Sequence, residues 1–193
     1  MAKRSRRAWR FAVILVVLSL TLTATLATVQ WLQARHQRSI EARLDRYEPL
    51  IWRHAQANAL PVELVRAVIR AESGGDPTAV SARNARGLMQ ITPIAEREVL
   101  RRDGESNTGD LFDPDYNLRI GTAYLRQLID AFDGDLHLAL AAYNWGPTNV
   151  SKLRKKYPDE PGIELVQRRA PAVTRRYCRE ILGDKAVTLP PRR

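Results

Sequence analysis

The clearest pattern of apolar and polar positions lies near the start of the chain, where residues 11–29 contain no charged side chain. As a helix rising about 1.5 Å per residue, this run would span about 28 Å, close to the hydrocarbon thickness of a bilayer. Trp9 and Trp31 flank the run at positions where aromatic side chains occupy the membrane interface. The pattern predicts a transmembrane helix over residues 11–31.

After this run, apolar residues recur at helical spacing, and no segment shows the alternation of period two that is typical of strands. A polar helical stalk is expected over residues 32–46, followed by one mainly α domain over 47–185 and a frayed tail over 186–193. Leu64, Val65, Val68 and Ile69 form the apolar stripe of a helix over 61–73. Six more helices are expected, over residues 47–58, from Thr92-Pro93 to about 102, 115–131 with Asp115 as its cap, 136–145, 147–157 and 172–182.

The net charge of +10 refines this picture, because Lys3, Arg4, Arg6, Arg7 and Arg10 supply half of it. Under the positive-inside rule, residues 1–10 are cytoplasmic, and the domain lies in the periplasm, held by a single pass through the inner membrane. Two alternatives stay open. The apolar run could be a cleaved signal peptide, which would also deliver the domain to the periplasm, or the core helix of a globular protein.

The candidates for redox or metal chemistry are few. Cys178 is the only cysteine, so an internal disulfide and a cysteine-based metal site are both excluded. His36, His54 and His137 are scattered, without a second ligand at helical spacing. No metal and no cofactor is predicted.

Glu72 is the strongest candidate for acid/base chemistry. It follows Leu64 and Val68 at intervals of four residues, so it lies on the apolar face where the helix meets a glycine-containing loop. A carboxyl group held against apolar side chains has a raised pKa, as a general acid at neutral pH requires. The periodicity alone also fits a glutamate whose carboxylate reaches solvent.

Two further segments favour the binding of sugars. Residues 87–93 combine apolar side chains with the amide of Gln90, and residues 141–146 place Tyr143, Asn144 and Trp145 at the end of a helix. Flat aromatic rings cover the C–H faces of sugars, while amides bond hydroxyl and acetamido groups.

These segments resemble, in order and spacing, the catalytic core of the soluble-type lytic transglycosylases, a family of the lysozyme-like superfamily that also contains goose-type lysozyme. The resemblance covers about residues 47–183 and implies a lysozyme-like, mainly α catalytic domain. It departs from a common family pattern at Val173, where a glutamate is usual, and at Asp76, where many relatives carry asparagine. The motifs that carry it are residues 71–81, 85–93, 113–121, 141–147 and 171–177.

The resemblance also implies roles for individual residues. Glu72 is the single acid/base catalyst, and Ser73 beside it helps to place the substrate. Met89 and Gln90 line the groove, Tyr143 and Asn144 contact the sugar next to the cleaved bond, and Tyr177 lies across the site near the catalytic carboxyl group.

The reaction implied by the resemblance is non-hydrolytic cleavage of the MurNAc–GlcNAc β-1,4 bond of peptidoglycan, which leaves 1,6-anhydro-MurNAc ends. One alternative is hydrolysis of the same bond by a muramidase, with Asp76 positioning a water molecule. Another is a non-catalytic peptidoglycan-binding module. A third, a nucleic-acid binder using the basic run at 152–156, conflicts with the predicted periplasmic location. The expected partners are glycan strands, the inner membrane and a secretion or conjugation apparatus, with no nucleic acid.

Overall fold

The structure is a computed structural model that describes the backbone of residues 2–106 and 108–192, and the side chains of residues 9, 18–106 and 108–192. Over these ranges it is almost entirely helical, and the only β pairings are isolated bridges such as the one between Arg86 and Ile91. The predicted mainly α class is confirmed. The helices are α1 Ala2–Asp45, α2 Glu48–Ala57, α3 Val62–Glu72, α4 Pro93–Asp103, α5 Pro114–Ala131, α6 Leu136–Trp145, α7 Pro147–Lys156, α8 Gly162–Arg169 and α9 Ala172–Leu182.

The chain divides into two compact units, one ending at Ala42 and the other beginning at Arg43. The first unit is formed by helix α1, on which Trp9 and Trp31 are exposed. Of the transmembrane helix expected over residues 11–31, residues 11–17 lie outside the range of described side chains. Among the side chains that are described, no helical segment combines the length and the hydrophobicity that crossing a bilayer demands.

The second unit begins at Arg43, four residues before the domain boundary expected at residue 47. Leu44 was assigned to the polar stalk, yet its side chain is fully buried in the second unit. Asp45 forms an ion pair with Arg66 of α3 at 3.0 Å. Gly75 packs so closely on this segment that an added Cβ would come within 3.0 Å of both Arg43 and Leu44. The last turn of α1 is therefore part of the domain that holds α3.

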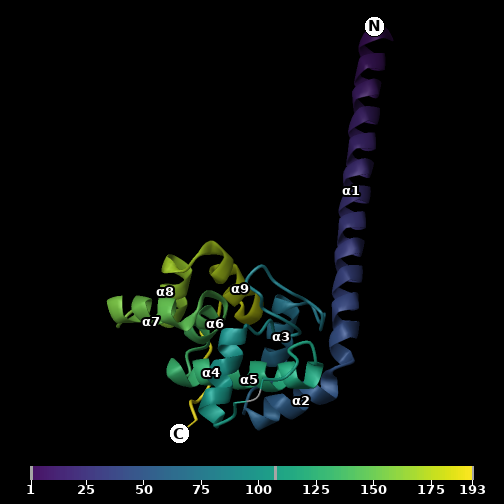
Figure 1. Ribbon diagram of the computed structural model, residues 1–193. Helices are drawn as coiled ribbons and strands as arrows, with labels where there is room; N and C mark the ends of the chain where they lie inside the picture. The colour runs from purple at the N-terminus through teal and green to yellow at the C-terminus, as the bar shows by residue number, and fades with distance from the viewer. Residues whose placement is uncertain (1, 107, 193) are drawn as a thin grey trace. The chain divides into compact units, whose positions relative to one another are not determined.

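Helix α6 is the central helix of the domain, with α5, α7, α8 and α9 packed around it (Figure 1). Residues 136–142 are all buried, as expected for a helix that is apolar on every side. Asp135 caps its first turn by accepting a hydrogen bond from the Leu138 N–H at 3.1 Å. Its last turn carries Tyr143 and Asn144, so the best-buried helix of the domain positions two of the predicted site residues.

The predicted helices are found, with local corrections. Thr92 caps α4, as expected, by accepting a hydrogen bond from the Ala95 N–H. Helix α5 is capped by Asp113 and not by Asp115, because Pro114 occupies its first turn and the Asp113 carboxylate accepts a hydrogen bond from the Asp115 N–H at 2.8 Å. Helix α8 was missed because its eight residues are too few for a clear periodic pattern.

The C-terminal segment was predicted to be frayed, but residues 185–192 are bound to the turn between α5 and α6. The Leu189 N–H donates to the Gly134 carbonyl at 2.9 Å, and the Lys185 carbonyl lies 2.8 Å from His137 Nε2. The Arg192 N–H donates to the carboxylate of Asp130 at 2.9 Å. These are mostly backbone contacts, which the side-chain pattern of a Pro- and Arg-rich segment does not reveal.

Candidate active site

Glu72 is the last residue of α3, whose apolar stripe Leu64, Val65, Val68 and Ile69 is buried as predicted. The Glu72 side chain itself is half-buried. Burial raises its pKa to about 7, although the nearby Tyr177 hydroxyl offsets part of that shift by favouring the carboxylate. A carboxyl group with this pKa can give up and take back a proton at neutral pH.

Tyr177 lies on α9, far from Glu72 in the sequence, and its hydroxyl lies near the Glu72 carboxyl group. Its side chain is only 6% exposed, and its hydroxyl makes no hydrogen bond of ordinary length with any described residue. Burial and the Glu72 charge both raise the pKa of Tyr177 well above its usual value, so the phenol stays protonated. Tyr177 and Glu72 thus interact with each other, because each contributes to the pKa shift of the other.

Tyr143 and Asn144 join α6 to the two segments that surround Glu72. The Tyr143 hydroxyl donates to the Met89 carbonyl at 2.8 Å. The Asn144 side-chain oxygen accepts a hydrogen bond from the Thr174 hydroxyl at 2.9 Å. Burial, and after it the Glu72 charge, raises the pKa of Tyr143 well above its usual value, as it does for Tyr177, so both phenols lie close to the carboxyl group.

The loop over residues 87–92 has a shape that requires special backbone conformations. Gly87 has a φ of 74° and Gln90 a φ of 51°, both in the left-handed region. An added Cβ at Gly87 would lie 2.3 Å from the Leu111 carbonyl oxygen and 2.4 Å from the Asn117 amide nitrogen. Glycine is therefore required at residue 87 by both its conformation and its surroundings.

Asn117 holds this loop in place, a role that the sequence analysis did not assign. Its side chain is fully buried on α5. Its oxygen accepts from the Met89 N–H at 2.8 Å, and its nitrogen donates to the carbonyls of Arg86 at 2.9 Å and Leu111 at 2.8 Å. The signal was present, because an asparagine among the apolar positions of an amphipathic helix must find polar partners when it is buried.

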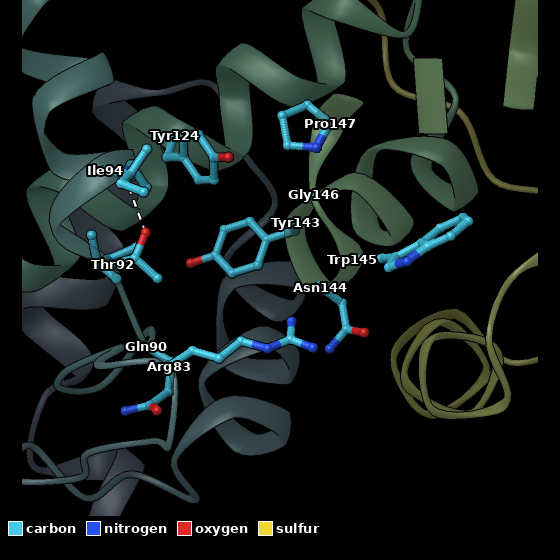
Figure 2. A pocket seen from close by; sticks show the side chains of 12 residues that line it. Arg83, Gln90, Thr92, Ile94, Tyr124, Tyr143, Asn144, Trp145, Gly146 and Pro147 are labelled. Carbon is cyan, nitrogen blue, oxygen red and sulfur yellow. Dashed lines mark hydrogen bonds between the residues drawn. The ribbon is translucent and has the colours of Figure 1, made fainter. Parts of the chain in front are cut away.

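A pocket of about 240 Å³ is lined by Gln90 of this loop and by Tyr143 and Asn144 of α6 (Figure 2). Its wall includes three aromatic side chains, Tyr124, Tyr143 and Trp145, and the rings of Tyr124 and Tyr143 lie 5.5 Å apart. Gln90 and Asn144 supply amide groups. The lining thus combines flat apolar surfaces with neutral hydrogen-bonding groups, as sugar recognition requires.

Three of the predicted substrate-binding residues, Ser73, Met89 and Gln90, take different positions relative to the pocket. The Met89 side chain is fully buried against Gly121 and does not line the pocket, contrary to the sequence prediction. The Ser73 hydroxyl donates to the Leu88 carbonyl at 2.8 Å and accepts from the Gly75 N–H at 3.1 Å. Gln90 does line the pocket, and its side-chain nitrogen is fixed by the carbonyls of Ala79 and Gly87, both at 3.0 Å.

Asp76, the candidate second carboxylate, is engaged in its own turn. One of its oxygens accepts hydrogen bonds from the Thr78 N–H at 2.9 Å and the Thr78 hydroxyl at 2.8 Å. These bonds lower the pKa of Asp76, which is half-buried. The pKa of Glu72 is set by burial and by Tyr177. Among the described residues, no group of three or more His, Cys, Asp and Glu side chains is arranged to hold a metal ion.

A family model described as the transglycosylase SLT domain matches residues 49–166, more than half of the chain. The chain belongs to the transglycosylase SLT family. The matched SLT range contains Glu72, the 87–92 loop, Asn117 and the Tyr143–Asn144 pair. Tyr177 lies beyond that range, and its place beside Glu72 comes from the packing of α9 on α3 and α6.

Relatives with this SLT domain include the soluble lytic murein transglycosylase of Escherichia coli strain K12, which is 35% identical over 54% of this chain. The membrane-bound lytic murein transglycosylase F of Desulfosudis oleivorans is 38% identical over 60% of this chain. Among solved structures, an inactive glutamate-to-glutamine mutant of lytic transglycosylase Slt from Pseudomonas aeruginosa is 32% identical over 70% of this chain, with a TM-score of 0.61. The alignments cover only 17%, 25% and 22% of these longer proteins, respectively.

Proposed function

We propose that this SLT domain is a lytic transglycosylase that cleaves the β-1,4 bond between MurNAc and GlcNAc in peptidoglycan without consuming water. The observation that carries the proposal is the half-buried carboxyl group of Glu72, which has a pKa of about 7 and acts electrostatically on Tyr143, a residue that lines the aromatic and amide-lined pocket. The names of the relatives support the same activity.

Glu72 first acts as the acid. Its proton passes to the glycosidic oxygen as the bond from that oxygen to the muramyl anomeric carbon breaks, and GlcNAc leaves with a hydroxyl group. The N-acetyl group of the muramyl unit stabilises the positive charge that develops at the anomeric carbon, a substrate-assisted exception to the usual pair of carboxylates. The Tyr177 hydroxyl, whose interaction with Glu72 favours the carboxylate form, donates a hydrogen bond to the new Glu72 carboxylate.

Glu72 then acts as the base. Its carboxylate removes the proton of the muramyl 6-hydroxyl, and the oxygen of that group bonds to the anomeric carbon to give the 1,6-anhydro ring. The carboxyl group ends protonated, as it began. One group serves both steps because its pKa of about 7 lies near the working pH of such an enzyme.

The test is the mass of the muropeptides released from purified sacculi. We expect products that are lighter by one water molecule than reducing-end muropeptides, from both the wild type and the Asp76→Asn variant, because Asp76 is bound in its own turn. If the wild type instead released reducing-end products, and Asp76→Asn released less of them, the enzyme would be a muramidase.

We further propose that residues 11–31 anchor the domain in the inner membrane and that the domain works in the periplasm, beside a secretion or conjugation apparatus that needs the wall opened locally. The support is the uncharged run over 11–29 and the basic block before it. In cell fractionation the full chain should be found in the membrane fraction and the chain without residues 1–31 should not. Equal distribution of the two would contradict anchoring.

A further inference from the structure

Arg83 is a cationic residue in the pocket wall for which neither the fold nor the reaction gives a role. It lies in the turn between α3 and the 87–92 loop, and its backbone N–H donates to the Ser81 hydroxyl at 3.2 Å. A second bond to that hydroxyl, from the Ala85 N–H at 3.1 Å, holds the turn together. In Figure 2 the Arg83 side chain extends across the pocket below Tyr143 toward Asn144.

The Arg83 guanidinium has no protein partner among the described residues, although the side chain lines the pocket. Most arginines of the domain are engaged: Arg53 pairs with Asp115 and Arg119 with Glu105. Even the neighbouring Arg86 donates to the Asn84 side chain and lies over the Phe112 ring. The other residues that line the pocket are all uncharged. The residues that line the pocket therefore carry one formal positive charge and no negative charge.

We propose that Arg83 binds a carboxylate carried by the muramyl unit and thereby makes the enzyme prefer strands with that charge. This inference rests on the proposed function. The backbone sugars of a glycan strand bear neutral hydroxyl and acetamido groups, which the pocket's rings and amides suit. The lactyl substituent of the muramyl unit supplies the negative charge, either as its own free carboxylate or through the carboxylates of an attached stem peptide.

The chemistry of arginine favours this assignment. A guanidinium group presents paired N–H donors that match the two oxygens of a carboxylate, and such charge-assisted bonds are stronger than neutral ones. Asn144 lies on the same pocket wall, so a sugar bound by its amide would bring its substituent within the range of Arg83.

The test compares wild type, Arg83→Gln and a matched control, Arg102→Gln, which alters an exposed arginine of α4 that does not line the pocket. Three soluble GlcNAc–MurNAc oligosaccharide probes are used: one with stem peptides, one with free lactyl carboxylates, and one whose lactyl carboxylates have been converted to methylamides. We expect Arg83→Gln to lower kcat/KM roughly tenfold on a carboxylate-bearing probe, as loss of one charged hydrogen bond implies. The loss should shrink at high salt and on the methylamide probe, and Arg102→Gln should match the wild type throughout.

The probes also identify the source of the carboxylate. A loss confined to the stem-bearing probe assigns Arg83 to the peptide, and a loss on the free-carboxylate probe assigns it to the lactyl group. Equal losses on all three probes, or none on any, would overturn the inference while leaving the transglycosylase reaction intact. If the wild type cleaves no probe, the proposed function fails. The inference about Arg83 can then be tested by binding: the affinities of Glu72→Gln and of the Glu72→Gln, Arg83→Gln double variant for the three probes would reveal whether Arg83 discriminates between them.

Discussion

Replacing Glu72 with Gln should lower kcat for the release of muropeptides from sacculi by at least about 10³-fold, within the range expected for loss of a general acid/base group. Glutamine keeps the size of the side chain and can still accept a hydrogen bond, but it cannot transfer a proton. In the proposed reaction one carboxyl group serves both steps, so no described residue can take over either half.

The raised pKa of Glu72 also predicts that Glu72→Gln changes how the free energy of unfolding depends on pH. Between its ordinary pKa of about 4.5 and its native value of about 7, the folded protein retains a proton that the unfolded chain has lost. The free energy of unfolding therefore falls as pH rises through this window. Glu72→Gln should remove that part of the pH dependence and be at least as stable as the wild type at pH 8, as measured by urea denaturation at pH 4, 6 and 8.

Activity should follow the same titration. The proposed resting enzyme carries a protonated Glu72, so kcat/KM should decline as pH rises through about 7. Glu63→Gln is the matched control, because Glu63 lies exposed in the first turn of the same helix. It should leave both the rate and the pH profile unchanged. Full activity in Glu72→Gln, or a rate independent of pH between 5 and 8, would remove Glu72 from the acid/base role.

Much of the fold could be predicted because helices carry their signals locally. The apolar stripe of α3, the Thr92 cap and the Gly146 stop of α6 are all set by residues within a few positions. Helix α8 and the bound C-terminal segment could not be predicted in the same way. Their structure depends on backbone bonds and packing against segments far away in the sequence, such as Gly134 with Leu189.

In the candidate site, too, some features could be predicted from local sequence and others could not. Periodicity placed Glu72 on an apolar face, and the raised pKa follows from that position. The place of Tyr177 near Glu72 was implied by the family resemblance and not by periodicity. The sequence could not reveal which side chains of the 87–92 loop point into the core and which into the pocket, because Gln90 has a positive φ that residue patterns do not predict. The resemblance implied that Met89 lines the groove, but its side chain lies in the core, and the residue that fixes the loop, Asn117, was not predicted.

The second large effect is expected from that overlooked residue. Asn117→Ala would leave the Met89 N–H and the Leu111 carbonyl without their present partner in a buried site, whereas the Arg86 carbonyl would keep its bond from the Ile91 N–H at 3.0 Å. Each such loss costs about 1–3 kcal/mol, so we expect the free energy of unfolding to fall by about 3 kcal/mol or more. Urea denaturation followed by circular dichroism measures this change.

Activity should fall as well, by about 100-fold in the folded fraction, a size that displacement of catalytic groups by about 1 Å can produce. The path is short: Asn117 holds the Met89 N–H, the Met89 carbonyl accepts from the Tyr143 hydroxyl, and Tyr143 lies beside Glu72. Asn58→Ala is the control, because the Asn58 amide bonds the His54 carbonyl and Thr122 but not this loop. It should lower stability while leaving the activity of the folded protein unchanged. If Asn117→Ala lost stability but kept full activity when folded, the 87–92 loop would not position the catalytic groups, and Tyr143 would have to be held by α6 alone.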